Sequence, residues 1–560
     1  MDGIAKKITA EFRSAAARIL LNRYFFFLCA FTAYLIILRQ MRGLPVCFPM
    51  FFTEGPLVLA IYWYCVRILR PVKSRNVLAA LPVFLIYAVH DAYYHGYGEM
   101  FRLAYLHDAA LLLEALPAGY CAVLLAVFAL PCALFLFYVD WRRKYRHLAA
   151  AALAAGLWLL FPGVFVRAFA AINTLPHDWD DYANASDRGR LTVMLNREAL
   201  RRFALHGLAK FRDGKDFLRD AREQSDFIRK YGSGRNVHLV MLESLLDPAL
   251  FRGLGLSHDP YHPDFRKFFG GNMGFSVSPV FGGETPQAEF ELLCGAPAYK
   301  RLYSMEFNGF TGAPVQCLPN VLRGAGYRTV ASHPYVPQWN NYLRAYPALG
   351  FGEMYFPKRY FNGPTYFSIK GVSPAEGLLF DGDLFRQTSD FLEKSKGPLF
   401  DYIVGIYGHF PFRLDAKLRP PFIAMTAGGQ QLVRVVNQFY YRTQAISEFV
   451  RRTVKREPKC LIIMVGDHLP SVDGGVETYR QLRYLPESAD PVHTTRILIV
   501  KDGKPVKYPV LRHSDIPAVI ADYLTGGKYC KKWRCAYMGN PPAEEESLSR
   551  YMHIMADGVK

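Results

Sequence analysis

Long apolar runs fill the first third of this chain, and ordinary globular sequence fills the rest. The runs lie near residues 19–38, 48–69, 77–95, 117–140 and 148–172. A membrane-crossing helix needs about 20 predominantly apolar residues, and each run has about this length. An aromatic content of 15% also excludes a disordered chain. The sequence therefore predicts a five-span membrane domain over residues 1–173, followed by a large soluble part.

Basic residues flank these runs unevenly, which predicts the orientation of the spans. Lys and Arg gather before the first run, after the second and after the fourth, and the alternate loops hold fewer of them. Cytoplasmic loops of membrane proteins carry this excess. We therefore expect a multi-pass protein of a bacterial inner membrane with a cytoplasmic N-terminus and everything after residue 172 in the periplasm or another extracytoplasmic space. Much of the net charge of +19 is then a topology signal, and nucleic acid is not an expected partner.

Half of the ten cysteines fall in the soluble part, where an oxidising compartment permits disulfides. These five are Cys294, Cys317, Cys460, Cys530 and Cys535. Cys530 and Cys535 flank a basic turn, which makes a local disulfide plausible. Cys460 begins an apolar strand and is expected to be a buried thiol.

The soluble part begins with a charged segment and continues with an α/β pattern. We expect residues 174–235 to form a helical connector along the membrane. Residues 236–540 are expected to form a catalytic domain, and residues 541–560 a peripheral tail. Candidate strands are 236–242, 327–332, 399–407, 460–466 and 496–500, and the clearest helix is 428–456. Near-continuous apolar strands that alternate with helices indicate a mostly parallel sheet covered on both faces.

Polar residues follow the ends of four candidate strands. They are Glu243, His333, His409 and the pair Asp467–His468. In an open α/β sheet, ligands bind beyond the carboxyl ends of the strands, so we expect these side chains to meet at one edge. Two carboxylates and one imidazole suit Mn²⁺, Mg²⁺ or Zn²⁺. Such a metal polarises a phosphoryl oxygen and activates a hydroxyl group.

A hydroxyl nucleophile is suggested by the stretch FGGETPQAEFELLCG at 281–295. Thr285 occupies an N-cap position, and Pro286 fits the first helical position. Backbone N–H groups at a helix N-terminus favour negative charge, so an alkoxide or a phosphoryl group would be stabilised there. An ordinary helix cap is the alternative explanation.

Together these motifs resemble the lipoteichoic acid synthase family, a branch of the alkaline phosphatase/sulfatase superfamily. The matching stretches are MLES (241–244), GETPQAE (283–289), LPNVLRGAGYRTVASH (318–333), GHFPF (408–412) and VGDHLP (465–470). The resemblance implies five α-helical spans followed by an extracytoplasmic α/β domain of the alkaline phosphatase/sulfatase type. It also implies a phosphoglycerol transferase.

The resemblance assigns a role to each matching residue. Thr285 resembles the threonine that becomes phosphorylated and also touches one divalent metal, for which Mn²⁺ or Mg²⁺ is favoured and Zn²⁺ stays open. The other implied metal ligands are Glu243, Asp467 and His468. His333 and His409 resemble the histidines that line the phosphate and head-group site, with His409 as the general acid.

One departure from the family pattern concerns the head-group site. Trp339 resembles a tryptophan that the family places near the head group, followed there by Asn-Arg. This chain has Asn340–Asn341 at those positions. Arg344, one helical turn further on, is the candidate substitute for binding the substrate. The identity of the head group therefore stays open.

The resemblance implies a ping-pong reaction. Thr285 attacks the phosphate of phosphatidylglycerol, diacylglycerol leaves, and an extracytoplasmic glycan or polymer then accepts the phosphoglycerol. A phosphoethanolamine transferase is the main alternative, although its lipid A-type members carry several disulfides near the threonine, where only Cys294 and Cys317 are candidates. A sulfatase needs an Arg-containing formylglycine motif that Cys317-Leu-Pro-Asn-Val lacks. A non-catalytic lipid-binding module would lack the threonine or a metal ligand.

Overall fold

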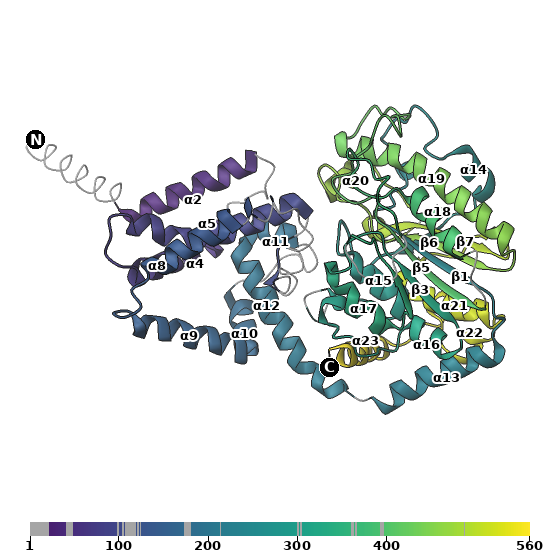
Figure 1. Cartoon of the computed structure of the whole chain (residues 1–560), viewed down its shortest axis with the longest axis horizontal. Coiled ribbons are helices and arrows are strands. Elements are labelled where there is room, and N and C mark those ends of the chain that lie inside the picture. The colour runs from purple at the N-terminus through teal and green to yellow at the C-terminus, as the bar shows by residue number, and fades with distance from the viewer. Residues whose placement is uncertain are drawn as a thin grey trace, which may run out of the picture. The chain divides into compact units, whose positions relative to one another are not determined.

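The structure is a computed structural model with two compact units, Met1–Leu205 and His206–Lys560. It describes residues 22–40, 49–97, 100–103, 106, 119, 122–123, 125–172, 181–212, 214–299, 302, 305–359, 363, 367–392, 397–486 and 488–559. The first unit is built from helices, and the second is an α/β domain (Figure 1).

The helices of the first unit follow the apolar runs of the sequence. They are α2 (Arg23–Gln40), α3 (Met50–Thr53), α4 (Gly55–Ile68), α5 (Arg75–Tyr97), the π-helical turn η2 (Leu125–Ala129), α8 (Leu130–Tyr138), α9 (Tyr145–Leu160), α10 (Pro162–Ile172), α11 (Asp181–Arg188) and α12 (Arg190–Gly207). Aromatic and aliphatic side chains of α2, α4 and α5 form one buried cluster.

Among the described helices, only Arg75–Tyr94 within α5 is long and apolar enough to cross a membrane on its own. A second span exists if α9 and α10 count as one broken helix, but the two meet at 92°. The expected span at 148–172 is therefore not one straight helix, because Pro162 disfavours helical backbone at Phe161 and the chain turns there. The runs near 19–38, 48–69 and 117–140 contain shorter apolar helices, and parts of them lie outside the described residues. The described helices thus do not support a five-span domain.

A buried carboxylate anchors the start of α12 within the first unit. Glu54, between α3 and α4, accepts hydrogen bonds from the backbone N–H groups of Leu191 (3.2 Å) and Thr192 (3.1 Å). Beside it, Arg190 forms a 2.7 Å ion pair with Asp91 of α5. Negative charge at a helix N-terminus is favourable. The expected connector at 174–235 is therefore divided, since α12 begins in the first unit and α13 (Lys215–Tyr231) belongs to the second.

The second unit contains a nine-stranded sheet with the order β4-β3-β5-β1-β6-β7-β2-β9 and with β8 paired to β7. Its strands are β1 (Val237–Leu242), β2 (Gly274–Val277), β3 (Arg328–Ser332), β4 (Glu353–Tyr355), β5 (Leu399–Gly405), β6 (Leu461–Gly466), β7 (Thr494–Lys501), β8 (Lys504–Val506) and β9 (Leu511–Arg512). The strands from β4 to β6 in this order are parallel, and β7 pairs antiparallel with both β6 and β2. The mostly parallel sheet is confirmed.

Helices cover both faces of this sheet (Figure 1). They are α13, α14 (Pro263–Phe269), α15 (Thr285–Cys294), α16 (Leu318–Gly324), α17 (Tyr342–Leu349), α18 (Asp381–Leu392), α19 (Gln430–Arg456), α20 (Val476–Gln481), α21 (Ile516–Leu524), α22 (Tyr529–Lys532) and α23 (Glu544–Gly558). All residues of β1 and β6 are buried, as expected of near-continuous apolar strands covered on both faces; His238 of β1 is the one polar side chain among them.

The C-terminal residues are part of the core and not a peripheral tail. Tyr551, Ile554 and Met555 of α23 are fully buried, and the Tyr551 hydroxyl donates to Glu306 (3.0 Å). Their spacing of three and four residues is typical of a helix with one apolar face, a signal that the acidic start of the segment obscures.

The cysteines behave largely as expected. The Cys530–Cys535 disulfide is confirmed, and Cys460 is a buried thiol. A second disulfide joins Cys294 at the end of α15 to Cys317 before α16.

A buried ionic triad joins β1 to its neighbours. His238 Nδ1 lies 3.1 Å from Asp401 on the adjacent β5, and Nε2 lies 3.0 Å from Glu457 after α19. Burial alone would lower the pKa of His238, but the hydrogen bonds to the two carboxylates outweigh it and raise the pKa to about 9. His238 is thus an imidazolium with both N–H groups paired.

This triad predicts that the domain loses stability at alkaline pH. The folded pKa of His238 lies above its unfolded value of about 6.5, so its contribution is complete below pH ~6.5 and disappears as the pH rises through about 9. Thermal melting of the purified protein in detergent should fall by several degrees between pH 6.5 and 9.5. A His238→Gln variant should melt lower at pH 6.5 and show a smaller further decline. An identical pH slope in both proteins would contradict this account.

Candidate active site

Two neighbouring parallel strands end in carboxylates. β1 pairs with β6 so that Leu242 lies opposite Gly466, and the next residues are Glu243 and Asp467. Both carboxylates are buried. The common register of the two strands therefore brings two acidic groups together at the carboxyl edge of the sheet, as the sequence predicts.

Backbone and hydroxyl donors hold these carboxylates in place. Asp467 Oδ1 accepts from the N–H groups of Ser244 and His468, both at 2.7 Å, and the Ser244 hydroxyl donates to Glu243 Oε1 (2.7 Å). Ser244 has a positive φ of 51°, which an L-residue rarely adopts and which turns its N–H toward Asp467. One oxygen of each carboxylate, Asp467 Oδ2 and Glu243 Oε2, faces Thr285.

The Thr285 hydroxyl stands at the centre of the cluster. Its Oγ1 lies 2.9 Å from Asp467 Oδ2, 3.2 Å from Glu243 Oε2 and 3.5 Å from His468 Nε2. Thr285 is the first residue of α15, and Glu284, with a φ of 61°, occupies the N-cap. The expectation that Thr285 is the cap is therefore wrong by one position. The consequence is favourable for chemistry, because its hydroxyl faces the carboxylates and His468.

The donor set fits a divalent cation. Glu243, Asp467 and His468 each offer a ligand atom, and these atoms lie within 4.8 Å of one another. His468 Nδ1 donates to the Leu469 carbonyl (3.1 Å), so Nε2 faces carboxylate oxygens 3.2 and 3.5 Å away. A lone pair facing two carboxylates is repulsive unless a proton or a cation lies between them. Carboxylate, imidazole and hydroxyl donors suit Mn²⁺, Mg²⁺ or Zn²⁺.

The pKa values of the two carboxyls move in opposite directions. Burial and the charge of Glu243 raise the pKa of Asp467 to about 6. Burial also works against ionisation of Glu243, but the charges of His468 and His409 lower its pKa. The pair therefore shares its negative charge unequally, as expected of two close carboxylates with no cation between them.

The other two residues expected at the carboxyl edge of the sheet are the histidines His409 and His333. His409 Nδ1 donates to the Phe410 carbonyl (2.7 Å), which leaves Nε2 for a substrate, and the ring is only partly buried. His333 Nδ1 accepts from the Tyr335 N–H (3.3 Å), so its proton lies on Nε2. Burial lowers the pKa of His333 to about 3, and the ring is therefore a neutral hydrogen-bond donor.

The segment at Trp339 differs from the expectation. Trp339 is half-buried, whereas Arg344 on α17 is exposed and has no ion pair within the described residues. Asn341 is buried, and its side-chain amide donates to the carbonyls of Phe307 and Phe310, both at 2.8 Å. An arginine at this position would lose both bonds. Asn341 thus has a structural role, and substrate binding by Trp339 or Arg344 stays a prediction.

Sequence reasoning missed one residue behind the cluster, His513. Its Nε2 donates to the carbonyls of Gly466 (3.0 Å) and Asp467 (3.2 Å), and its Nδ1 accepts from the Ser276 hydroxyl (2.7 Å). Burial lowers the pKa of His513 to about 4, so the ring is neutral. It fixes the end of β6 that carries Asp467. Its only sequence signal is a position after β9, a strand of two residues.

Glu289, one turn after Thr285, ends the motif GETPQAE, but the sequence alone assigned it no role. Its buried carboxylate accepts from the hydroxyls of Tyr342 (2.7 Å), Tyr346 (2.9 Å) and Tyr402 (2.9 Å). Burial raises the pKa of Glu289 to about 7. These bonds fasten α15 to α17 and β5. The Tyr342 ring also packs against His333, with centroids 4.5 Å apart.

Comparison with known proteins identifies the family. Residues 235–526, more than half of the chain, match the family model described as Sulfatase, and the chain belongs to the sulfatase family. The resemblance found in the motifs is also confirmed, because the chain is 25% identical to the lipoteichoic acid synthase of Staphylococcus saprophyticus over 221 residues, 37% of this chain and 32% of that protein.

Two further relatives widen the range of known functions. A putative cyclic beta-1,2-glucan modification protein of Rhizobium meliloti is 26% identical over 243 residues, 42% of this chain and 36% of that protein. The match thus spans about a third of the length of these curated relatives. Among solved structures, the Streptococcus pyogenes phosphoglycerol transferase GacH in complex with sn-glycerol-1-phosphate superposes with a TM-score of 0.46 at 15% identity, over 63% of this chain and 91% of that one.

The geometry predicts that Glu243 and Asp467 are required to hold a metal ion. Glu243→Gln and Asp467→Asn should each weaken Mn²⁺ binding by more than the ~10–100-fold that loss of an outer-sphere partner costs. Calorimetric titration and elemental analysis of the purified variants measure this. The control is Glu477→Gln, a half-exposed carboxylate paired with Arg480 outside the cluster. Full metal occupancy in both site variants would contradict the assignment.

Proposed function

We propose that this protein is a membrane-anchored phosphotransferase. It moves the phosphoglycerol head group of phosphatidylglycerol, by way of a phospho-Thr285 intermediate, to an extracytoplasmic glycan or polymer. The observation that carries the proposal is the position of Thr285 Oγ1, 2.9–3.5 Å from two buried carboxylates and an imidazole at the start of a buried helix. The presence of the hydroxyl and all three ligand side chains supports an enzyme over a non-catalytic lipid-binding module.

In the first half-reaction, the Thr285 oxygen attacks the phosphorus atom of the lipid phosphodiester. The Thr285 hydroxyl gives its proton to Asp467 Oδ2, 2.9 Å away. A bond forms between the threonine oxygen and phosphorus, and the bond from phosphorus to the diacylglycerol oxygen breaks. His409, with Nδ1 committed to a backbone carbonyl, presents Nε2 to the leaving oxygen and gives it a proton. Backbone N–H groups at the start of α15 stabilise the charge on the transferring group.

The second half-reaction reverses these steps with a new alcohol. His409 Nε2 now accepts the proton of an acceptor hydroxyl, whose oxygen attacks phosphorus and displaces the threonine oxygen. The neutral His333 ring, protonated on Nε2, hydrogen-bonds a phosphoryl oxygen throughout. Asp467 returns the proton to the Thr285 oxygen, His409 keeps the proton of the acceptor hydroxyl, and the enzyme is ready for another donor.

A divalent ion, Mn²⁺ or Mg²⁺ in preference to Zn²⁺, would be held by Glu243, Thr285, Asp467 and His468. When bound, it supplies Lewis-acid stabilisation of the threonine oxygen and of the phosphoryl charge. The ligand atoms of Glu243, Asp467 and His468, which lie within 4.8 Å of one another, support this assignment.

The lipid nature of the proposed donor indicates where the protein is located, and the names of its relatives indicate the kind of acceptor. A lipid donor requires access to a membrane surface, and the apolar first unit supports an inner-membrane location with the second unit on the extracytoplasmic side. The named relatives include a lipoteichoic acid synthase and a putative glucan modification protein. We therefore infer a polyhydroxylated surface glycan or polymer as acceptor.

One observation favours a second candidate, a phosphoethanolamine transferase. The Cys294–Cys317 disulfide closes the end of the helix that begins at Thr285. Disulfides near the threonine are a mark of lipid A-type transferases. The same disulfide argues against sulfate-ester hydrolysis, because Cys317 is bonded to Cys294 and cannot be a formylglycine precursor.

The threonine and the donor can be tested in one experiment. Full-length protein in detergent with Mn²⁺ should gain a phosphoglycerol adduct on Thr285 when incubated with phosphatidylglycerol, as read by intact-protein and peptide mass spectrometry. Thr285→Ala should abolish the adduct and leave the melting temperature nearly unchanged, since the side chain makes no capping bond. Thr426→Ala is the matched control. A phosphoethanolamine adduct from phosphatidylethanolamine would promote the second candidate, and transfer by Thr285→Ala would refute the nucleophile.

The general acid gives a separate prediction. His409→Gln should lower kcat for transfer by about 10²–10⁴-fold, because the leaving oxygen loses its proton donor, while KM changes little. His258→Gln, at an exposed histidine, should behave as wild type. Steady-state assays with a labelled head group measure both. A near-normal kcat in His409→Gln would show that another group gives the leaving oxygen its proton.

A further inference from the structure

Three segments of the second unit are joined by backbone hydrogen bonds and form what we call the site rim. They are residues 248–258, 413–427 and 480–486. The Leu485 N–H donates to the Leu250 carbonyl (3.0 Å), and the Ser257 N–H donates to the Ala424 carbonyl (2.9 Å). Residues 248–258 thus bind one neighbouring segment near each of their ends.

One apolar cluster packs the site rim against the candidate active site. Its members from the rim are Phe251, Leu254, Ile423 and Tyr484. The cluster also contains Leu469, the residue after His468, and Phe412, three positions after His409. The segments that carry both of these histidines therefore share a core with the rim, and the rim borders the site.

The site rim leaves large apolar side chains in contact with solvent. Leu418 is 57% exposed, Leu485 48% and Phe422 42%. The Phe422 ring packs against His258 and Tyr440, with centroids 4.6 and 4.7 Å away, and is thereby held at the surface. Moving apolar side chains out of water is favourable, so a partner that covers them binds more tightly.

Basic side chains accompany these apolar ones. The rim contains six Lys and Arg residues and one carboxylate, Asp415. The exposed basic residues are Arg252, Arg413, Lys417, Arg480 and Arg483. Of these five, only Arg480 forms an ion pair within the described residues, with Glu477 (2.6 Å). Asp415 is already bonded to the Ser373 hydroxyl (2.5 Å) and to the Lys417 N–H (2.9 Å).

Two exposed carboxylates next to the rim also have partners. Asp259 pairs with Arg266 (2.9 Å), and Asp473 accepts from the Gly429 N–H (3.1 Å) just before α19. Positive charge on the rim is therefore in excess, and it favours an anionic partner.

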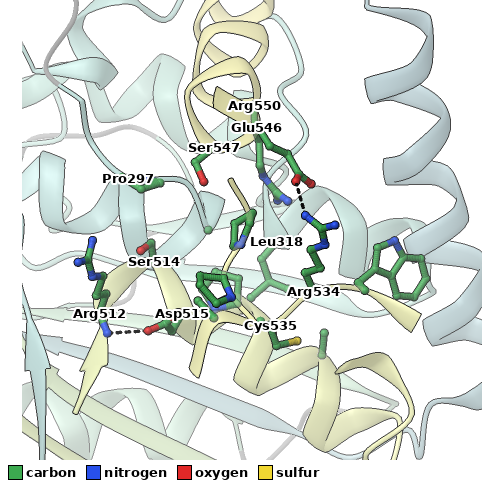
Figure 2. A pocket seen from close by; sticks show the side chains of 18 of the residues that line it. Pro297, Leu318, Arg512, Ser514, Asp515, Arg534, Cys535, Glu546, Ser547 and Arg550 are labelled. Carbon is green, nitrogen blue, oxygen red and sulfur yellow. Dashed lines mark hydrogen bonds and ion pairs between the residues drawn. The ribbon is translucent and has the colours of Figure 1, made fainter. Parts of the chain in front are cut away.

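This excess separates the rim from a second place where an apolar side chain is exposed. A cavity of ≈ 1040 Å³ opens elsewhere in the second unit, and no rim residue lines it (Figure 2). Val510, 43% exposed, is part of its lining. The lining contains four carboxylates and three arginines, and Arg534 pairs with Glu546 (3.3 Å), as Figure 2 shows. The cavity thus has no preference for an anion.

We propose that the site rim docks on a bilayer that contains anionic phospholipids. Leu418, Phe422 and Leu485 enter the boundary between head groups and acyl chains, and the exposed basic side chains bind lipid phosphates. Amphipathic protein surfaces bind membranes through this combination of buried apolar area and electrostatic attraction. The inference rests on the proposed function, because it identifies the surface that brings a lipid phosphate to Thr285.

Fluorescence of the labelled full-length protein in lipid nanodiscs tests the proposal. Cys→Ser substitutions at positions 29, 47, 121 and 132 remove every thiol except the buried Cys65 and Cys460, and Leu418→Cys then carries a bimane label. The nanodiscs contain equal parts of phosphatidylglycerol and phosphatidylcholine, with or without a phosphatidylcholine that bears a nitroxide on its head group. The nitroxide lipid should quench the label at position 418. Quenching should decrease in nanodiscs of phosphatidylcholine alone, and also when Arg413→Gln and Lys417→Gln are combined.

Lys504→Cys supplies the matched control. Lys504 is exposed on β8, where it pairs with Lys501, and Lys501 lies opposite Leu461 at the amino end of β6. A label at position 504 therefore sits at the edge of the sheet away from the site and should escape quenching.

The proposal is overturned if the labels at positions 418 and 504 are quenched equally, or if phosphatidylglycerol makes no difference at position 418. It is also overturned if the emission at position 418 is shifted to the blue but insensitive to the nitroxide lipid, since a second copy or another protein then covers the rim. Thr285→Ala should leave the quenching unchanged. Docking without a Thr285 adduct refutes the transfer alone, and an adduct without docking refutes only this inference.

Discussion

The second unit is organised around two negative charges that the fold forces together. Glu243 and Asp467 end adjacent parallel strands in the same register, and both are buried. Two unpaired carboxylates in such a place are costly, so the surrounding structure supplies donors from Ser244 and His468 and lays the start of α15 against them.

The polar residues at the carboxyl edge of the sheet could be predicted because the sequence patterns that mark them are local. Apolar runs such as 236–242 and 460–466 end abruptly in charged residues, and parallel strands deliver their carboxyl ends to one side. The supporting residues could not be predicted in this way. Glu289 meets its three tyrosines, and His513 meets the Gly466 carbonyl, only across long sequence separations. Strands as short as β9 carry no periodicity that identifies them.

Where a prediction from the sequence was wrong, a neighbouring residue or a tertiary contact outweighed the local sequence pattern. The apolar run at 148–172 has the composition of a continuous span, yet Phe161–Pro162 imposes a bend of 92°. The charged start of α23 suggested a solvated tail, whereas the following residues bury Tyr551 and Ile554. Asn341 departs from the family pattern because its amide satisfies two backbone carbonyls.

The immobility of α15 determines where motion must occur during turnover. Its residues from Pro286 to Cys294 are buried, its middle is tied to three tyrosine hydroxyls, and its end is covalently fixed. In the reaction that we propose, Thr285 therefore cannot move toward the lipid donor or the acceptor. Donor and acceptor must each be brought to one stationary point and be exchanged there. For the proposed reaction we therefore expect the exchange of donor and acceptor, more than the bond-making steps, to limit the cycle.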